Sequence, residues 1–282
     1  MFRQKMDWET RENAFAAFAH GPLTDFWRQR EEAEIIGVDN IPIRFVRFRA
    51  ASHDRVIVVC PGRIESYVKY AELAYDLFHL GFDVLIIDHR GQGRSGRLLS
   101  DSHRGHVDNF DDYVDDLAAF WAQEVTPGPW RKRYILAHSM GGAISTLFLQ
   151  RTPQVCDAIA LTAPMFGIVI RLPDWMVRHI LDWAEGNPRM RESYAIGTGR
   201  WQPLPFSLNV LTHSRERYRR NLREIRAAAG HPCEGGKPLV ITGAYHEILF
   251  EKDAMRSVAL NAIVDFFDRH NSPGGSPALS RG

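Results

Sequence analysis

The sequence predicts an α/β fold built on a mostly parallel, doubly wound sheet, and two observations lead to that prediction. Short and nearly continuous apolar runs, rich in β-branched residues, recur along the chain at residues 56–60, 82–87, 134–137, 158–161 and 238–241. Apolar runs that do not alternate are typical of strands covered by helices on both faces. Helical patterns separate several of these runs, at residues 67–80, 109–123 and 141–150. Alternation of strand and helix indicates parallel strands joined by helical crossovers.

The two ends of the chain add further expected elements. Residues 1–33 predict a polar N-terminal helix, and residues 34–50 hold two β-like runs around Asp39-Asn40, which predicts a hairpin. A last helix is expected over residues 253–270, with a buried face made of Met255, Val258, Ala259, Ala262, Ile263 and Phe266. Residues 271–282 are rich in Gly, Pro and Ser and are expected to be disordered.

The pattern changes between residues 165 and 226. Residues 166–181 are aromatic and aliphatic with scattered arginines, and residues 214–226 hold six arginines. We therefore expect a first core part over 1–164, a helical cap over 165–226, a second core part over 227–270 and a tail over 271–282. The arginine-rich stretch predicts either a solvated helix face or a contact for anionic lipid headgroups.

Composition excludes some classes of partner. The 282 residues carry 35 Lys and Arg against 34 Asp and Glu, so no bulk charge favours nucleic acid. Residues 1–15 lack a signal-like apolar run, no stretch of about 18 apolar residues occurs, and the three cysteines are far apart. We expect a cytoplasmic protein with free thiols and leave peripheral contact with an anionic membrane surface open.

A nucleophilic serine is expected at Ser139. The apolar run 134–137 leads directly into His138-Ser139-Met140-Gly141-Gly142, and a helical pattern follows. This strand–turn–helix order is that of a nucleophile elbow, in which small neighbours let strand and helix approach closely. Ala137 occupies a position that is usually glycine.

A serine hydroxyl needs a base, and His246 is the expected one. In hydrolases of this kind the histidine lies in a loop after the last strand, and His246 follows the run 238–241. The oxyanion hole is expected to use the backbone amides of Met140, after the nucleophile, and Arg63, in the loop after the run 56–60.

Three other motifs suggest alternative chemistry and are discounted. Residues 91–96 match a G-x-G-x-x-G nucleotide motif, but the sequence after them is typical of a loop and not of the helix that would hold a pyrophosphate. His103 and His106 lack a third metal ligand at good spacing. We expect no nucleotide, metal or cofactor. His138 adjoins Ser139 and is expected to point elsewhere from the turn, so we do not assign it as the base.

Several motifs together resemble the monoglyceride lipase and lysophospholipase group of the α/β-hydrolase fold, in particular its bacterial inner-membrane-associated lysophospholipases. They are the segments 88–96 and 104–107, the elbow 138–142, and His246-Glu247 followed by Glu251. The resemblance spans about residues 5–270. It implies hydrolysis of a lysophospholipid or similar monoacyl lipid without a cofactor, and a cap that covers the acyl chain.

The expected triad acid is missing from the sequence. In this group the acid follows a strand between the cap and the last strand, but residues 224–237 read as a helix end and a loop. A block is therefore expected to be absent near residues 222–224, together with one core strand. Glu216 and Glu224 lie in the arginine-rich stretch, and Asp174 and Glu234 are poorly placed, so no acid is assigned. The alternatives are an active lipid esterase, a shortened and impaired homologue that binds lipid or is vestigial, and a hydrolase or acyltransferase of another small ester.

Overall fold

The computed structural model describes residues 8, 10–166, 173–187, 190, 214 and 246–271. The N-terminal segment differs from the single helix expected over residues 1–33. It forms a 3-10 helix at Arg11–Ala14, then α1 (Phe15–His20) and α2 (Pro22–Arg28), and strand β1 already begins at Glu31. The break lies at Gly21-Pro22, because proline lacks an amide hydrogen and fits only the first turn of the new helix.

The described part of the sheet contains six strands in the order β1-β2-β4-β3-β5-β6. Strands β3 (Arg55–Cys60), β4 (Asp83–Ile87), β5 (Lys132–His138) and β6 (Ala158–Thr162) pair in parallel, while β1 (Glu31–Ile36) and β2 (Pro42–Phe48) are antiparallel. The β1–β2 hairpin turns at Asp39 and Asn40, whose φ values of 55° and 60° are those that aspartate and asparagine tolerate best among non-glycine residues. The mostly parallel sheet and this hairpin confirm the predicted fold class. The expected last strand at residues 238–241 lies outside the described residues.

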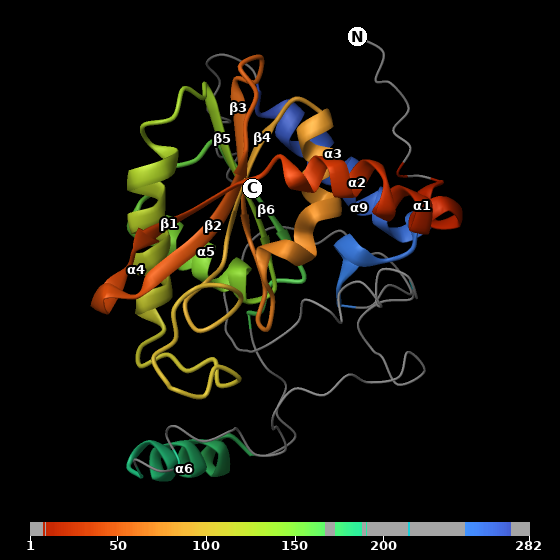
Figure 1. Cartoon of the computed structure of the whole chain (residues 1–282). Helices are drawn as coiled ribbons and strands as arrows, with labels where there is room; N and C mark the ends of the chain where they lie inside the picture. The colour runs from red at the N-terminus through yellow and green to blue at the C-terminus, as the bar shows by residue number, and fades with distance from the viewer. Residues whose placement is uncertain are drawn as a thin grey trace, which may run out of the picture.

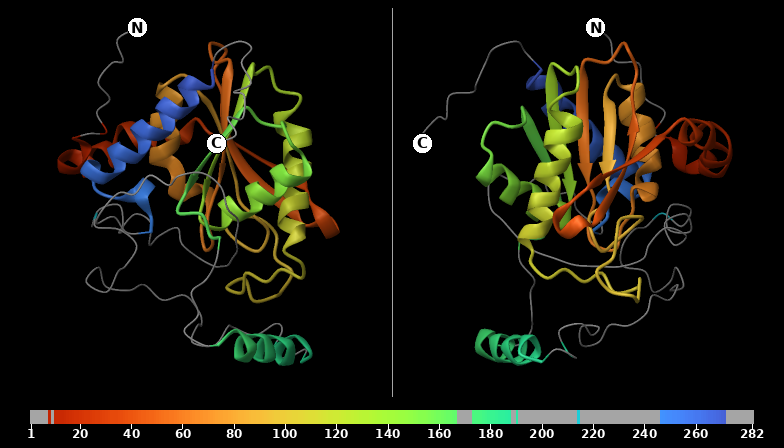
Figure 2. Two further views of the ribbon diagram at one scale, coloured as in Figure 1. Left: turned by 180° about the vertical axis from the view of Figure 1, so that it is seen from behind. Right: turned by 60° about the vertical axis from the view of Figure 1, so that its left-hand side comes forward.

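Helices cover both faces of the sheet (Figure 1). A 3-10 turn η4 (Tyr67–Tyr70), α3 (Ala71–His79) and α9 (Asp253–Arg269) lie on one face, and α4 (Asp111–Phe120) and α5 (Met140–Arg151) lie on the other, as both views in Figure 2 also show. A π-helical turn at Trp121–Val125 extends α4, and a 3-10 turn η7 (Ile248–Phe250) precedes α9. The doubly wound arrangement therefore agrees with the alternation of strands and helices in the sequence.

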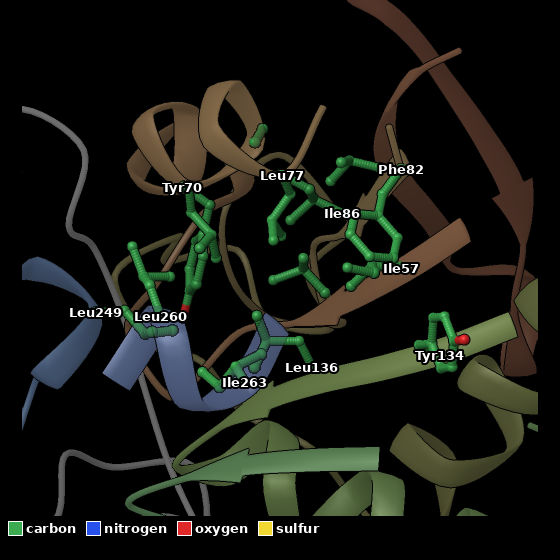
Figure 3. Packing of buried hydrophobic residues seen from close by; sticks show 14 of the residues in the cluster. Ile57, Tyr70, Leu77, Phe82, Ile86, Tyr134, Leu136, Leu249, Leu260 and Ile263 are labelled. Atoms are coloured by element: carbon green, nitrogen blue, oxygen red, sulfur yellow. The ribbon is translucent and has the colours of Figure 1, made fainter. Parts of the chain in front are cut away.

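Alternate residues of the buried strands supply two separate cores. On β3, Ile57 and Val59 pack toward α3 and α9, whereas Val56, Val58 and Cys60 pack toward α4 and α5. Figure 3 shows the first core, which contains Leu77 of α3, Leu260 of α9, and Ile57 and Leu136 of the sheet. Burial of both sheet faces explains why these strands read as continuous apolar runs.

The buried face of α9 coincides only in part with the one that the sequence predicted. Arg256, Leu260, Val264 and Phe267 are buried, together with Ala259, Ile263 and Asp253, whereas Val258 is 47% exposed. The buried face is rotated about the helix axis relative to the predicted one because the side chain of Arg256 points into the core. Its guanidinium donates to Asp76 of α3 at 2.6 Å and to the Leu249 carbonyl at 2.9 Å. A pattern based on hydrophobicity alone does not place a buried arginine.

Two further expectations concern the cap and the membrane. Of the cap expected over 165–226, the structure describes α6 (Asp174–Glu185), which Figure 1 draws beyond the carboxyl ends of the parallel strands. The arginine-rich stretch after Ser214 and the tail from residue 272 lie outside the described residues. Among the helices that are described, none has the length and apolar character needed to cross a bilayer.

Candidate active site

Ser139 lies in a strained turn between β5 and α5. Its φ of 49° and ψ of −116° fall in a region that side chains rarely adopt. Close approach of the neighbouring backbone explains the glycines that follow: a Cβ on Gly141 would lie 2.1 Å from the Cys60 carbonyl oxygen. A Cβ on Gly142 would lie 2.8 Å from the Pro164 side chain. The turn thus has the conformation and the small neighbours of a nucleophile elbow.

The backbone of Ser139 is fixed on both sides by the chain that leaves β6. Its amide donates to the Thr162 carbonyl at 3.1 Å, and its own carbonyl accepts from the Met165 amide at 3.0 Å. These hydrogen bonds hold the strained turn from outside the elbow itself.

His246 faces the serine hydroxyl. Its Nε2 atom lies 3.0 Å from Ser139 Oγ, within the range for a nucleophile and its base. Burial lowers the pKa of His246, while the Glu65 carboxylate acts in the opposite direction. A neutral imidazole at this distance can accept the serine proton.

His138 lies beside the pair but is directed elsewhere. Its ring centroid is 4.9 Å from that of His246, and its Nδ1 lies 3.0 Å from the Thr162 carbonyl oxygen and 3.1 Å from Thr162 Oγ1. Burial lowers the pKa of His138 to about 4, so its ring is neutral near pH 7. The structure brings His246, and not His138, to the serine hydroxyl.

The two amides expected to form the oxyanion hole have no competing acceptor in the described residues. The amides of Met140 and Arg63 donate no hydrogen bond there, whereas the Gly62 amide donates to the Glu65 carboxylate. The backbone of Gly62 lies directly against the nucleophile, because a Cβ on it would be 3.0 Å from Ser139 Cβ. The loop after β3 is therefore positioned beside the serine.

Three charged residues near the site were given no role in the sequence analysis. Lys69 is fully buried and contacts the carboxylates of Glu65 and Glu247. Buried charges are rare unless paired, and neither spacing nor periodicity marks a lysine as buried. The available signal was the position of Glu247 beside His246 and of Glu65 in the expected oxyanion loop.

The segment 88–96, which contains the nucleotide-like motif at 91–96, contacts the oxyanion loop. Asp88 accepts hydrogen bonds from Ser66 Oγ, the Tyr67 amide and the Arg94 amide, and burial raises its pKa to about 7. Gln92 Nε2 donates to the Gly62 carbonyl at 2.8 Å. No helix begins here, since the next one starts at Asp111. The glycines serve a tight loop packed around Asp88.

No carboxylate in the described part of the chain is hydrogen-bonded to Nδ1 of His246. Of the weak candidates for an acid, Asp174 begins α6, and Glu216, Glu224 and Glu234 lie outside the described residues. The described residues also contain no group of three or more His, Cys, Asp or Glu side chains able to hold a metal ion.

Comparison with known proteins identifies relatives over nearly the whole chain. The model of the family described as serine aminopeptidase, S33, matches residues 51–229. Lysophospholipase L2 of Escherichia coli (strain K12) is 68% identical, with 98% of each chain covered. The probable lysophospholipase L2 of Haemophilus influenzae is 32% identical over 73% of this chain and 66% of its own. Monoacylglycerol lipase of Mycolicibacterium smegmatis is 29% identical over 48% of this chain and 47% of its own.

The alignment with the Escherichia coli protein is longer than the chain itself. It extends over 335 positions, and the chain has 282 residues, so at least 53 aligned positions (335 less 282) have no counterpart here. The chain thus lacks at least 53 residues that a relative of 68% identity contains.

Proposed function

Since the chain belongs to the serine aminopeptidase S33 family of α/β-hydrolases, we propose that it cleaves the fatty-acyl ester of lysophospholipids or similar monoacyl lipids. The names of its relatives, lysophospholipase L2 and monoacylglycerol lipase, support a monoacyl lipid substrate. The observation that carries the proposal is the distance of 3.0 Å between His246 Nε2 and Ser139 Oγ at a strained strand–helix turn.

The proposed reaction proceeds through an acyl-serine. His246 accepts the proton of Ser139 Oγ as the oxygen attacks the ester carbonyl. The amides of Arg63 and Met140 donate to the oxyanion that develops on the carbonyl oxygen. His246 then protonates the departing glycerol oxygen, and a water molecule, deprotonated by the same histidine, releases the fatty acid.

Titration with a fluorophosphonate tests the serine chemistry. The wild-type chain is expected to incorporate one label per chain, and Ser139→Ala none. Release of fatty acid from lysophosphatidylethanolamine and from monoacylglycerol then tests the substrate class. Labelling that persists in Ser139→Ala, or no labelling of the wild type, would overturn the proposal. Transfer of the acyl group to a second lipid in place of water would instead indicate an acyltransferase.

A second candidate is a shortened, catalytically impaired homologue that binds lipid or is vestigial. The specific observations for it are the absence of at least 53 aligned positions and the lack, among the described residues, of a carboxylate on Nδ1 of His246. Loss of a triad acid costs roughly 10⁴ in turnover. Turnover of a lysophospholipid at the rate of the Escherichia coli relative would exclude this candidate.

We further propose a cytoplasmic location with peripheral contact at an anionic membrane surface. Six arginines in residues 214–226 and the exposed Trp175 and Trp183 of α6 support it, because tryptophan favours the lipid interface and arginine favours anionic headgroups. Sedimentation with vesicles tests this proposal. Binding should require anionic lipid and weaken with salt, and equal binding to neutral vesicles would contradict it.

A further inference from the structure

A fully buried cation links two loops of the candidate site. Lys69 of η4 has no exposed surface, and its Nζ atom contacts Glu65 and, at 2.6 Å, an oxygen of Glu247. Nζ also lies 4.5 Å from the centre of the Phe250 ring in η7. Removing a lysine and two carboxylates from water is costly unless they are mutually paired. None of the three takes part in the proposed bond-breaking steps.

Glu65 connects this cluster to the oxyanion loop. Its Oε2 atom accepts hydrogen bonds from the Gly62 amide and the Tyr70 hydroxyl, and its Oε1 atom pairs with Lys69. The backbone of Gly62 in turn abuts Cβ of Ser139. The carboxylate thus fixes the loop that carries the Arg63 amide.

Glu247 connects the same cation to the histidine. It directly follows His246 and comes just before η7. The segment that holds the base therefore reaches the oxyanion loop through one side chain, Lys69. Within the described residues, the His246 side chain makes one hydrogen bond, that with Ser139, so its position depends on the residues that flank it.

From this geometry we infer that Lys69 is a positioning residue, which sets the separation of the oxyanion loop and His246 by holding Glu65 and Glu247 together. This inference rests on the proposed serine chemistry and deepens it. A shift of reacting atoms by about 1 Å costs on the order of 100-fold in rate. Loss of the link should therefore slow attack by Ser139 without weakening substrate binding, since Lys69 is buried beneath the site.

The test uses four variants of the full-length chain. Lys69→Met removes the cation, and Glu247→Leu cuts the link on the histidine side alone. Glu247→Gln keeps an oxygen that accepts from Lys69. Arg11→Met is the matched control, because Arg11 is likewise buried and pairs with Glu72 and Asp76, in an ionic cluster that includes neither Ser139 nor His246.

Two readouts are taken at a temperature where circular dichroism shows every variant folded. Fluorophosphonate labelling and monoacyl-ester hydrolysis should slow on the order of 100-fold in Lys69→Met and Glu247→Leu, with kcat reduced and KM unchanged. Glu247→Gln should react at least about tenfold faster than Glu247→Leu. Arg11→Met should lose thermal stability but keep its labelling rate.

The second readout does not require turnover. In a ¹⁵N-histidine spectrum, the His246 signal is assigned with His246→Gln, and its dependence on Ser139 is established with Ser139→Ala. Lys69→Met and Glu247→Leu should move that signal as Ser139→Ala does, whereas Arg11→Met should not. Wild-type rates and spectra in Lys69→Met would overturn the inference. If the wild-type chain were not labelled by the fluorophosphonate, the proposed function would be overturned. The positioning role would still stand if Lys69→Met and Glu247→Leu showed the expected spectral changes.

Discussion

Phe267 of α9 lies flat against Tyr134 of β5. Their ring centroids are 4.6 Å apart with 20° between the planes, and the Tyr134 hydroxyl donates to the Phe267 carbonyl at 3.2 Å. Strand β5 leads to Ser139, and α9 follows the segment that contains His246. The contact thus joins the two parts of the chain that supply the nucleophile and its base.

Truncation of this contact should destabilise the fold. Phe267 is fully buried, so Phe267→Ala is expected to lower the free energy of unfolding by about 3–5 kcal/mol. Urea denaturation measures the change. The neighbouring Phe266 is partly exposed, and Phe266→Ala should cost less than half as much. Equal losses in the two variants would contradict the assigned face of α9.

Relief of backbone strain at Ser139 should stabilise the protein. A residue held in a sparsely populated region costs about 1–3 kcal/mol, and glycine adopts positive φ freely. Since glycine also adds entropy to the unfolded chain, we expect Ser139→Gly to be about 1 kcal/mol more stable than Ser139→Ala. Chemical denaturation of the two inactive variants gives the comparison. A less stable Ser139→Gly would show that the turn is not strained.

The labelling rate should depend on pH through His246. The base must be neutral, and histidine is neutral above its pKa. Because burial lowers the pKa of His246, the rate should rise with pH to a plateau with a midpoint below the ordinary histidine value of about 6.5. The groups that face this ring are Ser139, His138, Glu65 and Lys69.

Removal of the Glu65 charge tests the direction in which this carboxylate shifts the pKa of His246. The Glu65 carboxylate raises the pKa of His246, so Glu65→Gln should move the midpoint of the labelling rate further down. Rapid labelling across a pH series measures both midpoints. A wild-type midpoint above about 6.5 would contradict the lowered pKa of His246, and an upward move in Glu65→Gln would contradict the effect of the Glu65 carboxylate on it.

A methyl group on Gly62 should impair the site more than the fold. The added Cβ would lie 3.0 Å from Ser139 Cβ and 3.1 Å from His138 Cδ2, so the loop or these neighbours must give way by a few tenths of an ångström. We expect Gly62→Ala to label more slowly, but by less than the order of 100-fold that a displacement of about 1 Å would cause. Gly186→Ala is the control, because its Cβ meets only ordinary contacts beyond 3.4 Å. If Gly62→Ala were labelled at the wild-type rate, the position of this loop would not affect the reaction.

Restoring the missing block should raise turnover. A chimera that carries the residues present in the Escherichia coli relative and absent here would regain the expected acid. Turnover of a lysophospholipid should then rise by up to roughly 10⁴. The same chimera with its acid changed to asparagine should stay near the rate of the present chain. No difference between chimera and chain would show that the missing residues do not support the histidine.

Much of the fold could be predicted from the sequence, because burial on both faces leaves a local signature. Runs such as 56–60 and 82–87 needed no knowledge of their neighbours to be recognised as strands. The elbow at Ser139 was equally local, since strand, serine and glycines are contiguous. His246 was found by its place in the chain order, and the structure brings it to the serine.

The features that the sequence did not predict mostly depend on residues that are distant in the chain. The inward orientation of Arg256 follows from Asp76, which lies 180 residues away, and no hydrophobic pattern anticipates it. Lys69 is buried because Glu247, 178 residues away, meets it there. At the N-terminus, Gly21-Pro22 was a local signal for a break that the polar composition obscured.

The two hydrogen bonds between Ser139 and the segment Thr162–Met165 have a mechanical consequence. The polypeptide is fastened to the nucleophile before it leaves the core, so the elbow and the exit of β6 behave as one rigid block. A displacement of the carboxyl end of β6 would therefore be passed directly to the backbone of the serine, and the attacking oxygen keeps its place only while that strand end keeps its own.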